Sequence, residues 1–151
     1  MPVASLQTPV GPLAVTVEGE AVTRLTWDCR TEDTPCALLD EALTQLRAYF
    51  DGRLKTFDLP LAPKGNDLHQ AVFKVMLDIP YGQTRTYGDV AKELGTFGQP
   101  VGQACGANPI PVIIPCHRIL SATGLGGYSG SGGLDTKIAL LKMEGGYPFL
   151  L

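Results

Sequence analysis

A cysteine and a histidine stand side by side in this chain, directly after a short apolar run bounded by prolines. Residues 108–118 read Asn-Pro-Ile-Pro-Val-Ile-Ile-Pro-Cys-His-Arg. A cysteine is a useful nucleophile only as the thiolate, so it needs a base or a positive field within reach, and the base must be oriented by a third group. Cys116, with His117 as base and Glu144 as orienting group, meets this need. The segment predicts a reactive thiol on a rigid turn.

Disulfides and metal ligation are the other common uses of cysteine, and both fit the spacing poorly. The four cysteines are too few and too irregular for a disulfide framework. The pair Cys29 and Cys36 lies far in sequence from His69 and His117, which argues against zinc. We expect no metal site, and we expect Cys105 to be packed inside a helix. A packed, unreactive Cys116 remains the alternative to a nucleophile.

The composition indicates a globular protein. Of the 151 residues, 44% are hydrophobic and 18% are charged, and the net charge is −3. No run approaches the ~18 apolar residues of a membrane span. The first residues also lack the layout of a signal peptide. We therefore expect a soluble intracellular protein that is not bound to a membrane.

The stretch of residues 61–66 contains proline and glycine and separates two different sequence patterns. It predicts an N-terminal domain over residues 1–62 and a C-terminal domain over residues 63–151. Segments rich in β-branched residues in the first half predict a small antiparallel sheet. These strands are expected at residues 4–7, 11–18 and 21–27. Helical spacing of apolar residues between 35 and 50 predicts a helix that covers one face of the sheet.

The second half is helical and punctuated by glycine, so the fold class expected for the whole chain is α/β. The expected helices span residues 68–77, with Asp67 as N-cap, and residues 87–94, 101–107 and 134–144. The second and third of these are joined by a turn that contains Gly95, Gly98 and Pro100, as in a helix-turn-helix. Since most such pairs merely pack together, this pattern alone leaves DNA binding open.

Residues 121–133 contain six glycines around Tyr128. Glycine at this density lets the backbone approach a ligand closely, while a flexible surface loop is the alternative interpretation.

Four segments together resemble the O6-alkylguanine-DNA alkyltransferase family. They are residues 108–118, 79–87, 127–130 and 140–145. The Pro-Cys-His-Arg block with its upstream Asn-Pro is highly specific, whereas the first 60 residues resemble the family only loosely. The resemblance implies cofactor-free, single-turnover DNA repair, in which Cys116 takes an alkyl group from guanine O6 and keeps it as a thioether.

The resemblance also implies roles for individual residues. His117 and Glu144 would activate Cys116 through a water relay, and the Tyr87 hydroxyl would lie at guanine N3. A buried carboxylate beside His117 is expected to favour imidazolium, and imidazolium in turn to favour thiolate. The implied substrate contacts are Asn108, which ties the recognition helix to the active-site turn, the Ile119 carbonyl, Tyr128 as a pocket wall and the Ser129 amide.

The implied partner is double-stranded DNA containing O6-alkylguanine, bound by a monomer in the cytoplasm at the nucleoid or in the nucleus. The implied DNA contacts are Gln99, Thr86, Val101 and Arg118, with Arg118 also a candidate for a structural ion pair. Gln99 stands where many relatives carry an arginine that fills the gap left by the flipped base. Lys92 is the only basic residue between residues 86 and 107. We therefore expect shallow, sequence-independent minor-groove binding with a weak salt dependence.

Two other classes of function remain open from the residues alone. A Cys-His-Glu set could serve a thiol hydrolase, which would regenerate its thiol and turn over many times. A non-catalytic reader of damaged DNA is the second alternative, although such relatives lack the cysteine. The remaining lysines of the C-terminal half are expected to be solvated; they are Lys74, Lys137 and Lys142.

Overall fold

The computed structural model describes residues 2–32, 35–128 and 130–145. The chain divides into two compact units, Met1–Lys64 and Gly65–Leu151. The sequence pattern placed this boundary after residue 62, two positions earlier. Each unit is described by itself below.

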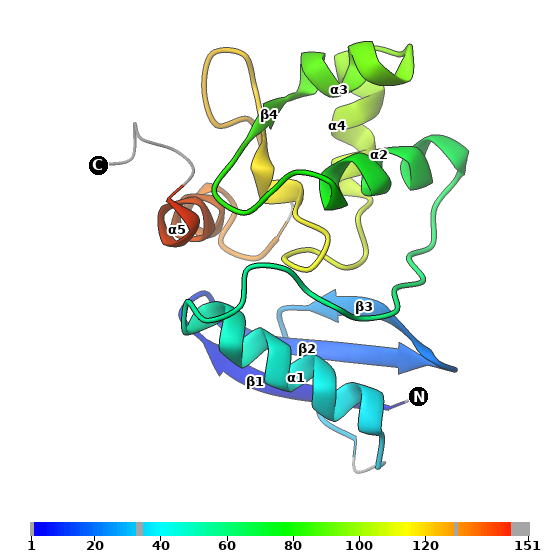
Figure 1. The fold of residues 1–151 in the computed structure, drawn as a ribbon, viewed down its shortest axis with the longest axis vertical. Coiled ribbons are helices and arrows are strands. Elements are labelled where there is room, and N and C mark those ends of the chain that lie inside the picture. Colours follow the sequence, from blue (N-terminus) through cyan, green and yellow to red (C-terminus); the bar gives the residue numbers. More distant parts are fainter. Residues whose placement is uncertain (1, 33–34, 129, 146–151) are drawn as a thin grey trace. The chain divides into compact units, whose positions relative to one another are not determined.

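The first unit is a three-stranded antiparallel sheet with one helix on it. The strands β1 (Val3–Thr8), β2 (Gly11–Glu18) and β3 (Ala21–Thr26) pair in the order β1-β2-β3. The helix α1 (Ala37–Phe50) packs on all three strands (Figure 1). Its buried side chains include Leu39, Leu46 and Tyr49, which recur at helical spacing. The predicted sheet and its covering helix are confirmed.

The segment after α1 belongs to this first unit. Val22 donates its backbone N–H to Pro60 O at 2.8 Å and accepts from the Ala62 N–H at 2.9 Å. Gln45 on α1 is buried and bonds both backbone groups of Asp58, at 2.8 and 3.0 Å. The first two residues of the expected linker, Leu61 and Ala62, are therefore held at the edge of the sheet.

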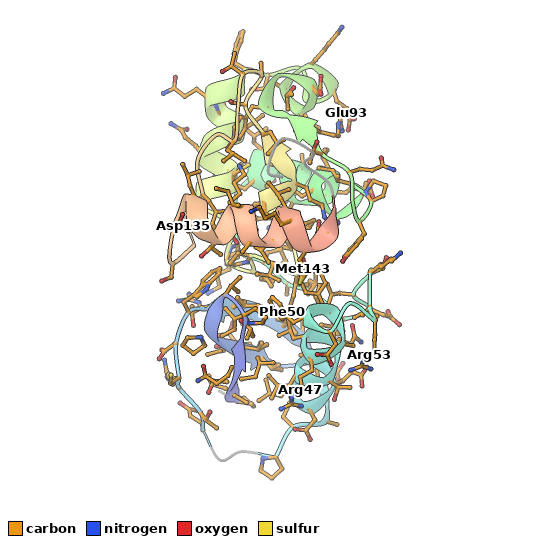
Figure 2. The ribbon with its side chains drawn as sticks, turned by 90° about the vertical axis from the view of Figure 1, so that its left-hand side faces the viewer. Arg47, Phe50, Arg53, Glu93, Asp135 and Met143 are labelled. Carbon is orange, nitrogen blue, oxygen red and sulfur yellow. The ribbon has the colours of Figure 1, made fainter. Side chains whose placement is uncertain are left out.

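The second unit is built mainly from helices. They are α2 (Asp67–Leu77), α3 (Tyr87–Leu94), α4 (Gly98–Gly106) and α5 (Leu134–Glu144). Helices α2, α3 and α4 pack against one another, and α3 followed by α4 forms the predicted helix-turn-helix (Figure 1). The helix α5 is seen from the side in Figure 2, between the labelled Asp135 and Met143. Among the helices of the described residues, none is long and apolar enough to cross a membrane.

Two helix starts differ from the predictions. The N-cap of α2 is Asn66, whose side-chain oxygen accepts the His69 N–H at 2.8 Å, so Asp67 lies inside the first turn. The helix α4 starts at Gly98, before the predicted residue 101, and includes Pro100 in its first turn. Proline is tolerated there because N–H groups of the first turn have no partner within the helix.

A minimal parallel pair of strands joins distant parts of the second unit. The strand β4 (Arg85–Thr86) pairs with β5 (Ile119–Leu120). Thr86 then caps α3 through a capping box with Asp89. The strand β5 directly follows the turn that carries Cys116, so this pairing brings Tyr87 next to the predicted nucleophile.

The cap of α2 gives a test of helix-start chemistry. Replacing Asn66 by alanine leaves the His69 N–H without its partner, so the free energy of unfolding should fall by about 1 kcal/mol. Asn66→Asp keeps an acceptor oxygen and should stay close to the parent protein. Urea denaturation followed by circular dichroism measures both variants. An equal loss in the two would show that Asn66 acts by something other than its side-chain oxygen.

Candidate active site

The cysteine lies at the start of a short 3-10 turn, Cys116–Arg118, and is 4% exposed. Asn108 at the end of α4 holds the loop before it. The Asn108 side chain donates to Ile114 O at 2.9 Å and accepts from the Ile110 N–H at 3.0 Å. Between them, Val112 has a φ of +73°, a left-handed conformation rare for a β-branched residue. Asn108 therefore braces a strained loop, as expected, but it acts on the turn and does not line the pocket.

His117, Arg118 and Glu144 form a buried cluster. Their exposed fractions are 0%, 7% and 6%. His117 Nε2 lies 2.8 Å from Glu144 Oε2, while Arg118 donates to both carboxylate oxygens at 2.8 and 3.0 Å. The third guanidinium contact is from Arg118 Nη1 to Ile79 O at 2.7 Å. Two groups therefore share one carboxylate.

Burial and this sharing both act on the charge of His117. Burial is the largest effect and lowers the pKa of His117; Glu144 acts in the opposite direction, and the Arg118 charge lowers the pKa further. Burial likewise raises the pKa of the Cys116 thiol to about 11. Glu144 thus acts on His117 in the expected direction, but burial outweighs it. Both shifts favour a neutral imidazole and a neutral thiol at rest, in place of the expected pairing of imidazolium with thiolate.

The hydrogen bond to Glu144 also sets the tautomer of His117. A carboxylate only accepts, so the proton of the neutral ring belongs on Nε2 and the lone pair on Nδ1. Nδ1 is buried and has no hydrogen-bond partner among the described residues. His117 is thus arranged as a base, not as an acid.

A pocket of about 290 Å³ opens beside the thiol. Its lining residues come from α3, α4, the active-site turn and the glycine loop: Tyr87, Gly102, Cys105, Gly106, Cys116, Gly127 and Tyr128. Gly126 has a φ of +71°, and a Cβ placed there would lie 2.8 Å from the Tyr87 ring. Glycine is required at that position because Tyr87 occupies the space. The predicted Tyr87 and Tyr128 both line this pocket.

Lys137 was expected to be solvated, and that prediction is wrong. The side chain is fully buried and its Nζ donates to three backbone carbonyls, Ile119 O at 2.7 Å, Leu125 O at 2.5 Å and Gly127 O at 3.0 Å. Nζ also lies 6.0 Å from the centre of the Tyr87 ring. Burial lowers the pKa of Lys137 to about 8. Lys137 therefore ties the glycine loop to the core of the site. The sequence signal was its spacing from Leu141 and Glu144, which lie on the same face of α5.

The other predicted residues divide between surface and core. Gln99 is exposed, and Thr86 is half-buried as the cap of α3. Val101 is fully buried and Arg118 is engaged with Glu144, so neither side chain is free to contact DNA. The Ile119 carbonyl, expected to meet the guanine amino group, already accepts from Lys137.

Ser129 lies outside the described residues. Within residues 2–32, 35–128 and 130–145, no group of three or more His, Cys, Asp or Glu side chains could hold a metal ion.

The buried thiol lies in a pocket that a helix-turn-helix helps to line, which defines a protein with a candidate cysteine nucleophile beside a helix pair of the kind that binds nucleic acids. The sequence model of the 6-O-methylguanine DNA methyltransferase DNA binding domain matches residues 67–146, and that of the ribonuclease-like domain of the same enzyme matches residues 1–63. The chain therefore belongs to the 6-O-methylguanine DNA methyltransferase family.

Individual relatives point to the same family. The methylated-DNA–protein-cysteine methyltransferase of Mycobacterium tuberculosis is 43% identical over 150 residues, which cover 93% of this chain and 90% of the relative. The enzyme of the same name from Methanosarcina acetivorans is 50% identical over 108 residues, covering 70% and 68%. The crystal structure of the M. tuberculosis O6-methylguanine methyltransferase superposes with a TM-score of 0.82 at 40% identity, covering 95% and 93%. A structure of the M. tuberculosis protein in complex with DNA gives 0.81 at 39% identity, covering 95% and 92%.

The role of Arg118 in keeping His117 neutral can be tested by NMR. In Arg118→Met the carboxylate of Glu144 loses its counter-charge, so the pKa of His117 should rise. Titration of the His117 ring protons measures this shift. Lys142→Met removes an exposed charge from α5 and should leave the pKa of His117 where it is. A pKa of His117 that stays the same or falls in Arg118→Met would contradict the charge balance described above.

The protonation state of Cys116 can be tested by labelling. Because the resting thiol is neutral, its reaction with iodoacetamide should be slow at pH 7 and should rise toward a pKa of about 11. An ordinary thiol reacts with a midpoint near pH ~8.5. The rate is followed on the Cys116 peptide by mass spectrometry. A midpoint at or below that of the ordinary thiol would mean that the site stabilises the thiolate at rest.

Proposed function

We propose that this chain repairs DNA by moving the alkyl group of an O6-alkylguanine onto the Cys116 sulfur. The observation that supports this most is the placement of Cys116 in a small pocket between two tyrosines, next to a base with a free lone pair. The volume of about 290 Å³ is at the low end of ligand pockets, which suits a single planar base with its substituent. The names of the relatives point to the same reaction.

The proton must leave the thiol as the sulfur attacks. With Cys116 neutral at rest, His117 Nδ1 takes this proton, directly or through a water molecule. The resulting imidazolium then lies 2.8 Å from the Glu144 carboxylate, which stabilises it. The S–C bond forms as the C–O6 bond breaks, and the electron pair of the broken bond stays on the guanine. The site therefore separates charges only while the reaction takes place.

Tyr87 is placed to handle the leaving guanine. Burial raises the pKa of Tyr87, so its phenol stays protonated at neutral pH and can donate to guanine N3. The Lys137 ammonium, 6.0 Å from the ring centre, would stabilise the negative charge that develops on the phenol. The imidazolium then gives up its proton and the Tyr87 phenolate takes one up, by exchange with solvent. Overall one proton passes from the thiol to the guanine, and a thioether and an unmodified base remain.

The target base has to leave the base stack of the DNA duplex to reach this pocket, at a cost of a few kcal/mol. Tyr128 would wall the pocket, and the Ser129 amide stays a prediction for guanine O6.

On the surface, the N-termini of α3 and α4 can offer backbone N–H groups to phosphates without basic side chains. Thr86 and Gln99 lie at these two helix starts and remain proposed DNA contacts. The partner is double-stranded DNA containing O6-alkylguanine, bound in the minor groove by one protein molecule, in the cytoplasm at the nucleoid or in the nucleus.

Intact-protein mass spectrometry tests the proposal. After incubation with a duplex containing one O6-methylguanine, each molecule should gain one CH₂ unit, located on the Cys116 peptide. Cys116→Ser should gain nothing, and Cys29→Ser, which alters an exposed cysteine, should react like the parent protein. No mass gain on Cys116 from a folded protein would overturn the repair function. Release of product with regeneration of the thiol would instead favour the thiol hydrolase.

A further inference from the structure

Phe97 is an anomaly on the surface of the second unit. Its exposed fraction is 80%, while the other large exposed hydrophobic residues among those described are Leu77 at 47% and Leu134 at 45%. Phe97 also occupies the N-cap of α4, where its side chain makes no capping hydrogen bond. Serine, threonine, asparagine or aspartate would stabilise that position. The residue thus costs helix stability and exposes a ring to water, with no gain inside the fold.

The position of Phe97 is at the rim of the pocket. A Cβ placed on Gly98, the next residue, would lie 3.9 Å from the Tyr87 Cβ. Gly98 also shares one face of α4 with Gly102 and Cys105, which line the pocket. Helices α3 and α4 pack against each other (Figure 1), and Tyr87 at the start of α3 lines the pocket. Phe97 therefore lies just before the start of the face of α4 that lines the pocket of Cys116.

The surface around Phe97 has little positive charge to hold DNA. Lys92 is the only basic residue between residues 86 and 107, and Gln99 in the first turn of α4 is exposed but uncharged. A base that flips out of the duplex leaves a gap between the neighbouring bases, and a protein side chain can fill this gap. Apolar side chains such as phenylalanine serve as wedges between bases in proteins that bind the minor groove. Ring stacking needs no charge and accepts any base sequence.

We propose that the Phe97 ring inserts into the DNA stack next to the target nucleotide and keeps the flipped base out. Phe97 is then a positioning residue, because it acts on the neighbouring bases and not on the reacting atoms. This inference rests on the proposed repair function. It also assigns to Phe97 the gap-filling role for which Gln99 was the candidate from the sequence.

The test compares two substrates. One is a duplex with a single O6-methylguanine, and the other is the free base O6-methylguanine, which needs no flipping. In Phe97→Ala the rate of methyl transfer from the duplex should fall roughly 5- to 100-fold, as expected from the loss of one stacking contact. The slower free-base reaction should be unchanged. Phe97→Tyr keeps an aromatic ring and should recover most of the duplex rate.

Matched controls separate stacking from other effects. Leu77→Ala removes another exposed apolar side chain, at the end of α2 and outside the pocket lining, and should leave both rates unchanged. A duplex with 2-aminopurine beside the lesion reports unstacking through its fluorescence. The rise in fluorescence on binding of the parent protein should be lost in Phe97→Ala and kept in Phe97→Tyr.

Each other outcome has a definite meaning. Equal losses on both substrates would make Phe97 a structural residue and overturn the wedge. An unchanged duplex rate in Phe97→Ala, with a large loss in Gln99→Ala, would also overturn it and return the role to Gln99. Failure of the parent protein on both substrates would instead reject the repair function itself.

Discussion

The carboxylate of Glu144 is the group on which the second unit depends. It joins the end of α5 to the turn that carries Cys116, through His117 and Arg118. Arg118 extends the link to Ile79 O, just after α2. Three segments that are distant in sequence thus meet at one buried charge. Removing one partner of such a buried set typically costs 3–5 kcal/mol, so the same contacts that orient the base also hold the fold.

Two partners on one carboxylate explain how the site can be both stable and reactive. A buried Glu144 with only His117 would draw a proton onto the ring, and the base would be spent before any substrate arrived. Burial lowers the pKa of His117, and the charge of Arg118 lowers it further, which favours a neutral imidazole at rest. The carboxylate is still in contact when the ring takes a proton during the reaction. The thiol can then wait as the less reactive acid form, which protects a cysteine that can be used only once.

Much of this molecule could be predicted from its sequence, because its main signals are local. Segments rich in β-branched residues predicted the sheet, and helical patterns predicted the covering helix and the helix-turn-helix. The resemblance implied roles for Cys116, His117, Glu144 and Tyr87, which stay predictions. The errors lie where distant groups meet. The spacing of Lys137 from Leu141 and Glu144 was a signal for burial, but the carbonyls of Ile119, Leu125 and Gly127 that accept from its ammonium are brought there only by the fold.

The charge of His117 could not be predicted for the same reason. The carboxylate beside it was expected and Arg118 was a candidate for an ion pair, but the full burial of the ring, which is the largest effect on its pKa, depends on the tertiary packing. From the sequence, an arginine next to an active-site histidine can point to DNA or into the core. Arg118 points into the core because α5 places Glu144 beside it. The predicted starts of α2 and α4 differ from the observed ones for local reasons. The start of α2 depends on a single side-chain oxygen, that of Asn66, and the first turn of α4 tolerates Pro100.

The two-residue pairing of β4 with β5 also bears on how the protein folds. Arg85 and Thr86 find Ile119 and Leu120 only after the intervening chain, including α3 and α4, has closed into a long loop. Non-local contacts of this kind form late, because loop closure costs entropy before the contact repays it. The helices can therefore be formed while Tyr87 is still away from Cys116. A partly folded chain would carry the nucleophile without its pocket, so competence should appear in one late step together with the closing of this short ladder.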